Sequence, residues 1–253
     1  MKISVVTYNI RCDVKDDGIN YFFNRAYYVL KKIKSKLPDV IGFQETTDKI
    51  SDFLKTNLPE YTFVGLGRNS DLRGESNLVA FRSDKFGALS TDQFWLSPTP
   101  MTPGSRYEDQ SLCPRICVSL VLNIKGTGTL FRMYNTHLDH ISEYARTLGM
   151  NSIIKRLLSD KEILDLPLIL TGDMNATPNA ECIVNVTSVK ELPLIDAASS
   201  LADTFHGYGK TGGKIDYIFV NENTKIISTE KWDDVFDGIY LSDHYPLEAV
   251  IEI

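Results

Sequence analysis

The sequence has no long apolar run, and no stretch approaches the roughly 18 consecutive apolar residues that a membrane-spanning helix needs. Its first ten residues, MKISVVTYNI, carry one lysine and then alternate like a strand. A secretory signal would instead place a basic segment before a long apolar one. These features predict a cytoplasmic protein without a membrane span.

Cysteine and proline are scarce. Cys12, Cys113, Cys117 and Cys182 fit neither a Cys-x-x-Cys metal motif nor a dense disulfide framework, so free thiols in the core are expected. With 10 prolines, 43% hydrophobic and 24% charged residues, the composition is typical of a globular protein and not of a disordered one. Since no linker interrupts the 253 residues, one domain over residues 1–253 is expected.

An excess of basic charge is also missing. The net charge is −6, from 27 basic and 33 acidic residues, and no dense Lys/Arg block occurs. A protein that covers long duplex DNA usually has a basic balance or stripe. The charge therefore disfavours broad duplex binding, and it leaves open a short strand end or a small phosphorylated substrate in a locally basic pocket.

Two catalytic signatures are absent. GYGKTGGK around Lys210 would need glycine in place of Thr204 to form a phosphate-binding loop, and it precedes a predicted strand instead of following one. No GxSxG motif is present, which disfavours a serine nucleophile.

Hydrophobic periodicity predicts strands that alternate with helices. The expected strands are residues 1–10, 40–45, 61–65, 78–81, 86–95, 115–124, 129–137, 168–170, 214–220 and 247–253. The expected helices are residues 24–36, 50–54, 150–158 and 183–189. A hairpin at KGTG beside helix-linked strands indicates an α/β fold of mixed sheets covered by helices. Residues 96–114, rich in Pro, Ser, Thr and Gly, are expected to form a long loop near the functional site.

The stretch LPLILTGDMN combines a short apolar strand with polar residues that could form a functional site. A short buried strand is followed by Gly172, which is expected to allow a sharp turn. Asp173 and Asn175 would then point the same way from the end of an extended strand, where open α/β sheets bind ligands. The alternative is an Asp-x-Asn turn, in which both side chains serve the local backbone.

Other predicted strands also end on polar residues. These residues are Asn9, Glu45, His137, His140, Asp216, Asp243 and His244. A single histidine is more often structural than catalytic. All four histidines of the chain, His206 included, lie in or beside such strand-end clusters, so coincidence is the weaker explanation.

This mixture suits phosphate-ester hydrolysis. Carboxylates with a nearby carboxamide are suitable ligands for Mg²⁺ or Mn²⁺. Hydrolysis further needs an oriented water, a group that takes its proton and donors for the phosphoryl oxygens. His244, oriented by Asp216 or Asp243, fits the base. His137, Asn175 and Arg115 fit the phosphate cradle.

The ordered set TYN, QE, NTH, GDMN, IDYIF and SDHYP, from Thr7 to Pro246, resembles the endonuclease/exonuclease/phosphatase superfamily with its DNase I-like fold. The resemblance implies a four-layer α/β/β/α sandwich with mixed, largely antiparallel sheets. It also implies a divalent-metal-dependent phosphoesterase.

The resemblance carries roles onto individual residues. Glu45 resembles the principal metal ligand, with Asn9 and Asp243 beside the metal. Asp173 and Asn175 resemble the pair that positions the water and a phosphate oxygen, His244 with Asp216 the catalytic histidine pair, and His137 the histidine on the scissile phosphate. Arg115, His140 and His206 would contact substrate.

The segments FWLSPTPMTPGS and NTHLDH are similar to a bacterial group related to the carbon catabolite repressor and nocturnin-type 3′ exonucleases. A 3′-5′ exonuclease on single-stranded nucleic acid is therefore the leading expectation. The alternatives are a phosphoesterase for a small phosphorylated metabolite or lipid headgroup, and a binding module that has lost the chemistry.

Overall fold

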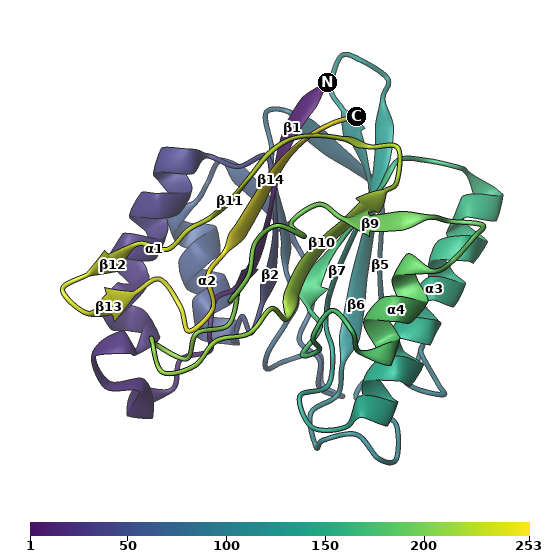
Figure 1. Cartoon of the computed structure of the whole chain (residues 1–253). Helices are drawn as coiled ribbons and strands as arrows, with labels where there is room; N and C mark the ends of the chain where they lie inside the picture. The colour runs from purple at the N-terminus through teal and green to yellow at the C-terminus, as the bar shows by residue number, and fades with distance from the viewer.

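Two six-stranded sheets lie face to face in the computed structural model, which describes residues 1–253, and helices cover both outer faces (Figure 1). The first sheet has the order β11-β14-β1-β2-β4-β3 and the second β5-β6-β7-β8-β10-β9. The first sheet comprises β1 (Lys2–Asn9), β2 (Val40–Gln44), β3 (Tyr61–Val64), β4 (Val79–Arg82), β11 (Lys225–Lys231) and β14 (Leu247–Glu252). The second comprises β5 (Phe86–Trp95), β6 (Ile116–Ile124), β7 (Leu130–His137), β8 (Leu168–Asp173), β9 (Leu194–Asp196) and β10 (Asp216–Asn221).

Both sheets are mixed and largely antiparallel. The parallel pairs are β1 with β2 and β7 with β8, and all other neighbours within the two sheets run antiparallel. A small hairpin of β12 (Val235–Phe236) and β13 (Ile239–Tyr240) lies outside them. The prediction of mixed sheets is confirmed, and KGTG forms the expected hairpin turn between β6 and β7.

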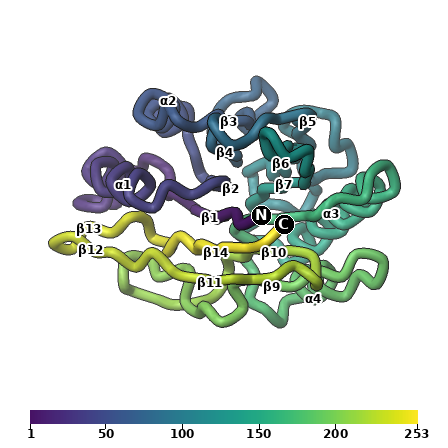
Figure 2. The backbone as a smooth tube through the Cα atoms, turned by 90° about the horizontal axis from the view of Figure 1, so that it is seen from above, coloured from purple at the N-terminus to yellow at the C-terminus, as the bar shows by residue number.

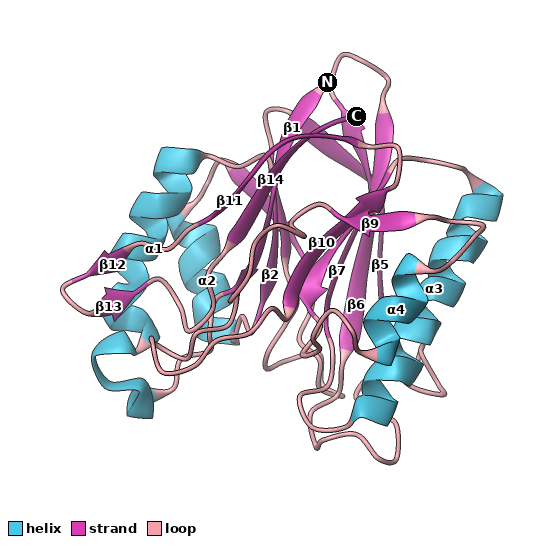
Figure 3. Ribbon diagram, in the orientation of Figure 1, coloured by secondary structure: helices cyan, strands magenta, loops and turns pink.

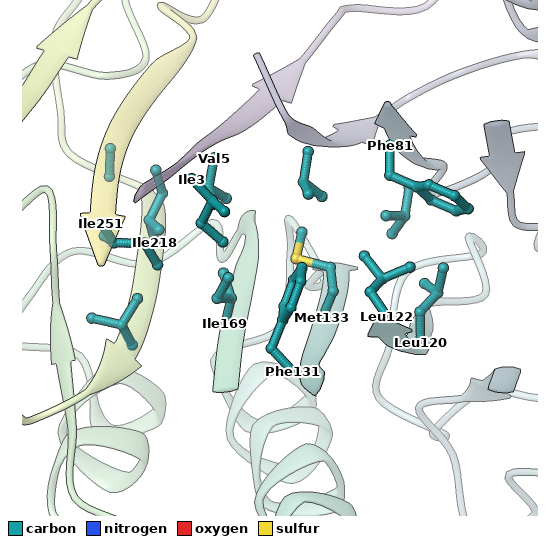
Figure 4. Close-up of a cluster of buried hydrophobic side chains, with 14 of the residues drawn as sticks. Ile3, Val5, Phe81, Leu120, Leu122, Phe131, Met133, Ile169, Ile218 and Ile251 are labelled. Carbon is teal, nitrogen blue, oxygen red and sulfur yellow. The ribbon is translucent and has the colours of Figure 1, made fainter. Parts of the chain in front are cut away.

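Three apolar cores separate four layers (Figure 2). Between the sheets, Ile3 and Val5 of β1 lie opposite Met133 of β7 and Ile169 of β8 (Figure 4). The outer face of the first sheet is covered by α1 (Phe22–Lys36) and α2 (Asp48–Asn57). That of the second is covered by α3 (Glu143–Ile163) and α4 (Glu181–Thr187). The α/β/β/α sandwich is therefore confirmed.

Local sequence signals set the helix ends. Thr47 and Ser142 accept hydrogen bonds from the backbone N–H groups of Ile50 and Ala145, and so cap the first turns of α2 and α3. Leu37, in a left-handed conformation, ends α1 directly before Pro38. Helix α3 begins at Glu143, well before the expected residue 150. The start was missed because the first turns bury small or polar residues, namely Ala145, Thr147 and Gly149, in place of large apolar ones.

The strands β9 and β11 and the 3-10 helix η1 (Lys15–Asn20) were not predicted from the sequence. Strand β11 is an exposed edge strand, so its side chains do not show the alternating burial that marks a half-buried strand.

The chain ends meet on one side of the sandwich, where the Ile253 N–H donates to the Met1 carbonyl (2.9 Å). No helix is long and apolar enough to cross a membrane. The opposite end of the sheets is formed by loops (Figure 3), and the polar strand ends lie there.

Candidate active site

The predicted site residues converge at the loop end of the two sheets. The carboxyl ends of β1, β2, β7 and β8 meet the amino ends of β6, β10 and β14 at this edge. They surround a cavity of about 430 Å³. Of the predicted residues, the cavity is lined by Glu45, Arg115, His137, His140, Asp173, Asn175, Asp243 and His244.

The two sheets are joined below this cavity by a buried polar network. Gln44 Nε2 and Thr171 Oγ1 both donate to Asn135 Oδ1, at 2.7 and 3.0 Å. Asn135 Nδ2 donates in turn to the carbonyl of Phe43 (2.7 Å). Gly42 permits this approach, since a Cβ there would lie 2.2 Å from Thr171 Oγ1.

Asp173 and Asn175 reach the cavity through a turn, so the expectation of an extended chain was wrong. Strand β8 ends at Asp173, and Asn175 has φ +47°. The Asn175 N–H donates to Asp173 Oδ1 (2.9 Å), which is the Asp-x-Asn turn. The turn still directs both side chains to the cavity, because Asn175 Nδ2 lies 3.0 Å from His137 Nε2.

Gly172 does not form the expected sharp turn. It lies inside β8, and its φ is not positive. A Cβ at this position would come within 2.4 Å of the Thr136 carbonyl oxygen on the neighbouring β7. Glycine is required here for a close approach of two strands.

His244 is paired with two carboxylates. Its Nδ1 lies 2.9 Å from Asp216 Oδ2, and its Nε2 lies 3.7 Å from Asp173 Oδ2. Asp216 and Asp173 are register partners on β10 and β8. Burial alone would lower the pKa of His244, but the charges of Asp216 and Asp173 raise it to about 10. Burial raises the pKa of Asp173 to about 7.

Glu45 and Asp243 place two further carboxylates in the cavity. Asn9 Nδ2 bridges Glu45 Oε1 and Asp173 Oδ2, at 3.0 Å from each, and the Cys12 N–H donates to Glu45 Oε2. Burial would raise the pKa of the Glu45 carboxyl, but the Asn9 hydrogen bond and the charge of Arg11 lower it. Glu45 is thus held as an anion.

Arg11 is a cavity residue that sequence reasoning missed. Its Nε lies 3.0 Å from Asp17 Oδ2 and 3.7 Å from Asp243 Oδ2, and its Nη1 lies 4.0 Å from Glu45 Oε2. The available signal was its position two residues after Asn9 in TYNIR.

The donor set fits a hard divalent cation. Glu45 and Asp243 supply anionic oxygens at a partly exposed position in the cavity. The Asn9 oxygen instead accepts from the Arg11 N–H (3.0 Å), so in this arrangement Asn9 orients the carboxylates through its nitrogen. A second group of ligand atoms, from Asp173, Asp216 and His244, lies within 4.8 Å of one another.

The other end of the cavity holds two arginines. Arg115 is only 4% exposed, and its Nη2 lies 2.9 Å from His140 Nδ1. Arg68, also missed from the sequence, pairs with Glu75 at 2.8 Å. Burial, and next the charges of Arg115 and Arg68, lower the pKa of His137 well below its usual value. His137 is therefore neutral.

Three predicted residues lie behind the cavity wall. Asn9 and Asp216 contact residues that line it. His206 stacks on Tyr245, with 3.8 Å between the ring centroids, and its Nδ1 accepts the Gly209 N–H. Burial and the charge of His244 lower the pKa of His206 to about 4. These contacts resemble those of a structural histidine.

The loop of residues 96–114 reaches the site at its carboxyl-terminal end. Cys113 lines the cavity, and Ser111 donates both its N–H and its hydroxyl to the buried carboxylate of Asp139. Asp139 Oδ1 also accepts the N–H groups of Ile141 and Ser142. This carboxylate ties the loop to the segment after β7.

The model of the endonuclease/exonuclease/phosphatase family matches residues 6–244. Among curated proteins, no sequence matches the chain. A crystal structure of an endonuclease/exonuclease/phosphatase from Bacteroides vulgatus is 31% identical, covers 100% of this chain and 99% of its own, and has a TM-score of 0.93.

Two further solved structures are similar. The mannosyl-6-phosphatase of Bacteroides thetaiotaomicron is 25% identical, with coverage of 99% and 100% and a TM-score of 0.87. The human nocturnin catalytic domain with bound sulfate is 19% identical, with coverage of 99% and 94% and a TM-score of 0.79, and it shows the shared fold. The chain therefore belongs to the endonuclease/exonuclease/phosphatase family, whose members are phosphoesterase and nuclease hydrolases.

Proposed function

We propose that this chain is a Mg²⁺- or Mn²⁺-dependent phosphodiesterase that removes nucleotides from the 3′ end of single-stranded nucleic acid. The observation that carries the phosphoesterase function is the arrangement of His244, Asp216 and Asp173 beside the carboxylates of Glu45 and Asp243 in one cavity. The nucleic-acid substrate is supported by the exonuclease-like sequence segments and by Arg68 and Arg115 at one end of the cavity.

Glu45 and Asp243 would hold the metal, oriented by Asn9 and the Cys12 N–H. A bound divalent ion would polarise a phosphoryl oxygen and balance its negative charge. The lowered pKa of Glu45 keeps this carboxylate ionised for such a role.

Asp173 and His244 have different roles in proton transfer: one accepts a proton and the other donates a hydrogen bond. With a pKa near 10, His244 is an imidazolium at neutral pH, so we assign it as a hydrogen-bond donor to a phosphoryl oxygen in place of the base suggested by the sequence. Asp173, with a pKa near 7, takes the proton of the attacking water. Asp216 orients His244.

His137 and Asn175 would bind the scissile phosphate. The amide Nδ2 of Asn175 donates to His137 Nε2, so the proton of the neutral ring lies on Nδ1. A phosphoryl oxygen would replace His137 as the acceptor for Asn175, and the neutral ring, with its proton then on Nε2, would donate to the same phosphate.

A small phosphorylated sugar is the second candidate substrate. It is favoured by the 25% identity to a mannosyl-6-phosphatase over nearly the whole chain. A lost activity is disfavoured, since Glu45, Asp173, Asp216 and His244 are all present and in contact with partners.

We also propose one domain for residues 1–253, because β1 and β14 pair in one sheet and the cavity draws side chains from both sheets. The cytoplasmic location stays a prediction.

The test is cleavage of a 5′-labelled single-stranded oligoadenylate, with phosphate release from mannose 6-phosphate measured in parallel. A ladder that shortens from the 3′ end with Mg²⁺ or Mn²⁺, and is lost in Asp173→Asn, is expected. Phosphate release without a ladder would establish the second candidate. The absence of both activities would refute the proposal.

A further inference from the structure

Strand order arranges the functional side chains along the cavity. In the second sheet β6, β7 and β8 are neighbours, and they present Arg115, His137 and Asp173 at one edge. Adjacent strands lie about 4.8 Å apart, so the backbones of Arg115 and Asp173 are separated by roughly 10 Å. The guanidinium of Arg115 is thus two strands from the proposed site of water attack.

The first sheet repeats this order. β1 and β2 lie against β8 and β7, and the segment before β4 lies against β6, where Asn77 Nδ2 donates to the Ile116 carbonyl (2.8 Å). Glu45 follows β2, whereas Arg68 lies in the segment between β3 and β4. Both sheets therefore place carboxylates at the centre of the cavity and an arginine at the same end, where Arg68 is paired with Glu75.

Arg115 has hydrogen-bond donors without partners. Its Nη2 lies beside His140, and its Nε is 3.8 Å from Asp139 Oδ2, which exceeds hydrogen-bond distance. The buried Nε and Nη1 have no hydrogen-bond partner. Leaving charged donors unpaired in a buried position costs free energy. Both atoms are closed to solvent, so a rotation of the guanidinium would turn them toward an anion in the cavity.

We propose that Arg115 and Arg68 form a second anion subsite, which binds a phosphate group of the substrate other than the one that is cleaved. This inference rests on the proposed function, because His137, Asn175 and the metal ligands account for the scissile phosphate. Arginine suits the task, since its planar donors bind two phosphate oxygens at once. The second phosphate belongs to the next nucleotide of a strand or to a small bisphosphorylated molecule.

Binding of three probes tests the subsite. They are adenosine 5′-monophosphate, adenosine 3′,5′-bisphosphate and the dinucleotide pApA, titrated calorimetrically with Mn²⁺ in a His244→Ala background that prevents turnover. We expect at least one of the two-phosphate probes to bind about tenfold more tightly than the monophosphate, as one added charge-assisted contact allows. Tighter binding of pApA alone would indicate that the second phosphate belongs to a nucleic-acid strand. Tighter binding of the bisphosphate alone would indicate a small bisphosphorylated substrate.

Substitution of the arginines should abolish this preference. In Arg68→Gln combined with Arg115→Gln, the ratio of the two-phosphate affinity to the monophosphate affinity should fall to within about twofold of unity. Arg73→Gln, an exposed arginine in the same segment as Arg68, is the matched control. If Arg115→Gln fails to fold, as judged by circular dichroism, Arg68→Gln alone should lower the ratio about threefold.

The subsite is refuted if the protein with both arginines binds no two-phosphate probe more tightly than the monophosphate, or if the preference persists in the double variant. Hydrolysis by the protein with His244 intact is measured separately. If the protein hydrolyses substrate but binds no two-phosphate probe more tightly than the monophosphate, the subsite alone is refuted. If it binds a two-phosphate probe more tightly but hydrolyses nothing, the proposed function is refuted.

Discussion

Replacing Asp216 by asparagine should shift the alkaline limit of activity. Asp216 Oδ2 lies 2.9 Å from His244 Nδ1, and its charge is the largest of the causes that raise the pKa of His244 to about 10. The carboxamide of the substituted side chain would keep an oxygen acceptor of the same shape and remove the charge. A hydrogen bond to a charged group contributes about 1.5–3 kcal/mol, which corresponds to roughly 1–2 pH units.

The assay is the pH dependence of kcat/KM. The proposal predicts that activity rises through about pH 7, as Asp173 loses its proton, and falls as pH approaches 10, where His244 loses its own. In Asp216→Asn the alkaline limb of the pH profile should move toward neutral pH by roughly 1–2 units. The pKa of the His244 ring, followed by NMR titration, should fall by the same amount.

The exposed Asp165→Asn variant serves as the control and should leave both limbs in place. The same pairing bears on stability. Because the pKa of His244 is higher in the folded chain than the usual 6.5, its contribution is complete below about pH 6.5 and is lost as pH rises toward 10. An unchanged alkaline limb in Asp216→Asn would refute the assigned role of this pair.

Three further predictions follow from single contacts. Arg11→Met removes a cation from the proposed metal carboxylates and should raise Mn²⁺ affinity about tenfold in a calorimetric titration; weaker binding would contradict this. Gly42→Ala should lower the free energy of unfolding in urea by about 1–3 kcal/mol, whereas Gly213→Ala, with open space around its Cβ, should change it little. Asn175→Ala removes the donor beside His137 and should lower kcat about 100-fold without loss of secondary structure by circular dichroism.

Much of the fold could be predicted because its central strands are strongly patterned. Strand β1, the hairpin of β6 and β7 and helix α1 show the apolar periodicity of their class, and β8 contains a continuous apolar run, residues 168–170, between Pro167 and Gly172. The edge strand β11 could not be found in this way, since its stability depends on pairing with β14 and not on its own burial.

The site was predictable where polar residues interrupt apolar strands, as at Glu45 and Asp173. Arg11 and Arg68 were missed because an arginine in a loop is ordinarily solvated, and only tertiary contacts bring these two into the cavity. The geometry of Asn175 was also beyond the sequence, because Asp-x-Asn fits both an extended strand end and a turn.

The most direct test of the central claim is the rate of hydrolysis of bis(4-nitrophenyl) phosphate by the metal-stripped protein, before and after addition of Mn²⁺, beside Glu45→Gln. Mn²⁺ is expected to restore hydrolysis in the wild type, and Glu45→Gln is expected to be at least about 100-fold slower at the same metal concentration. Equal rates with and without metal, or an unimpaired Glu45→Gln variant, would contradict it.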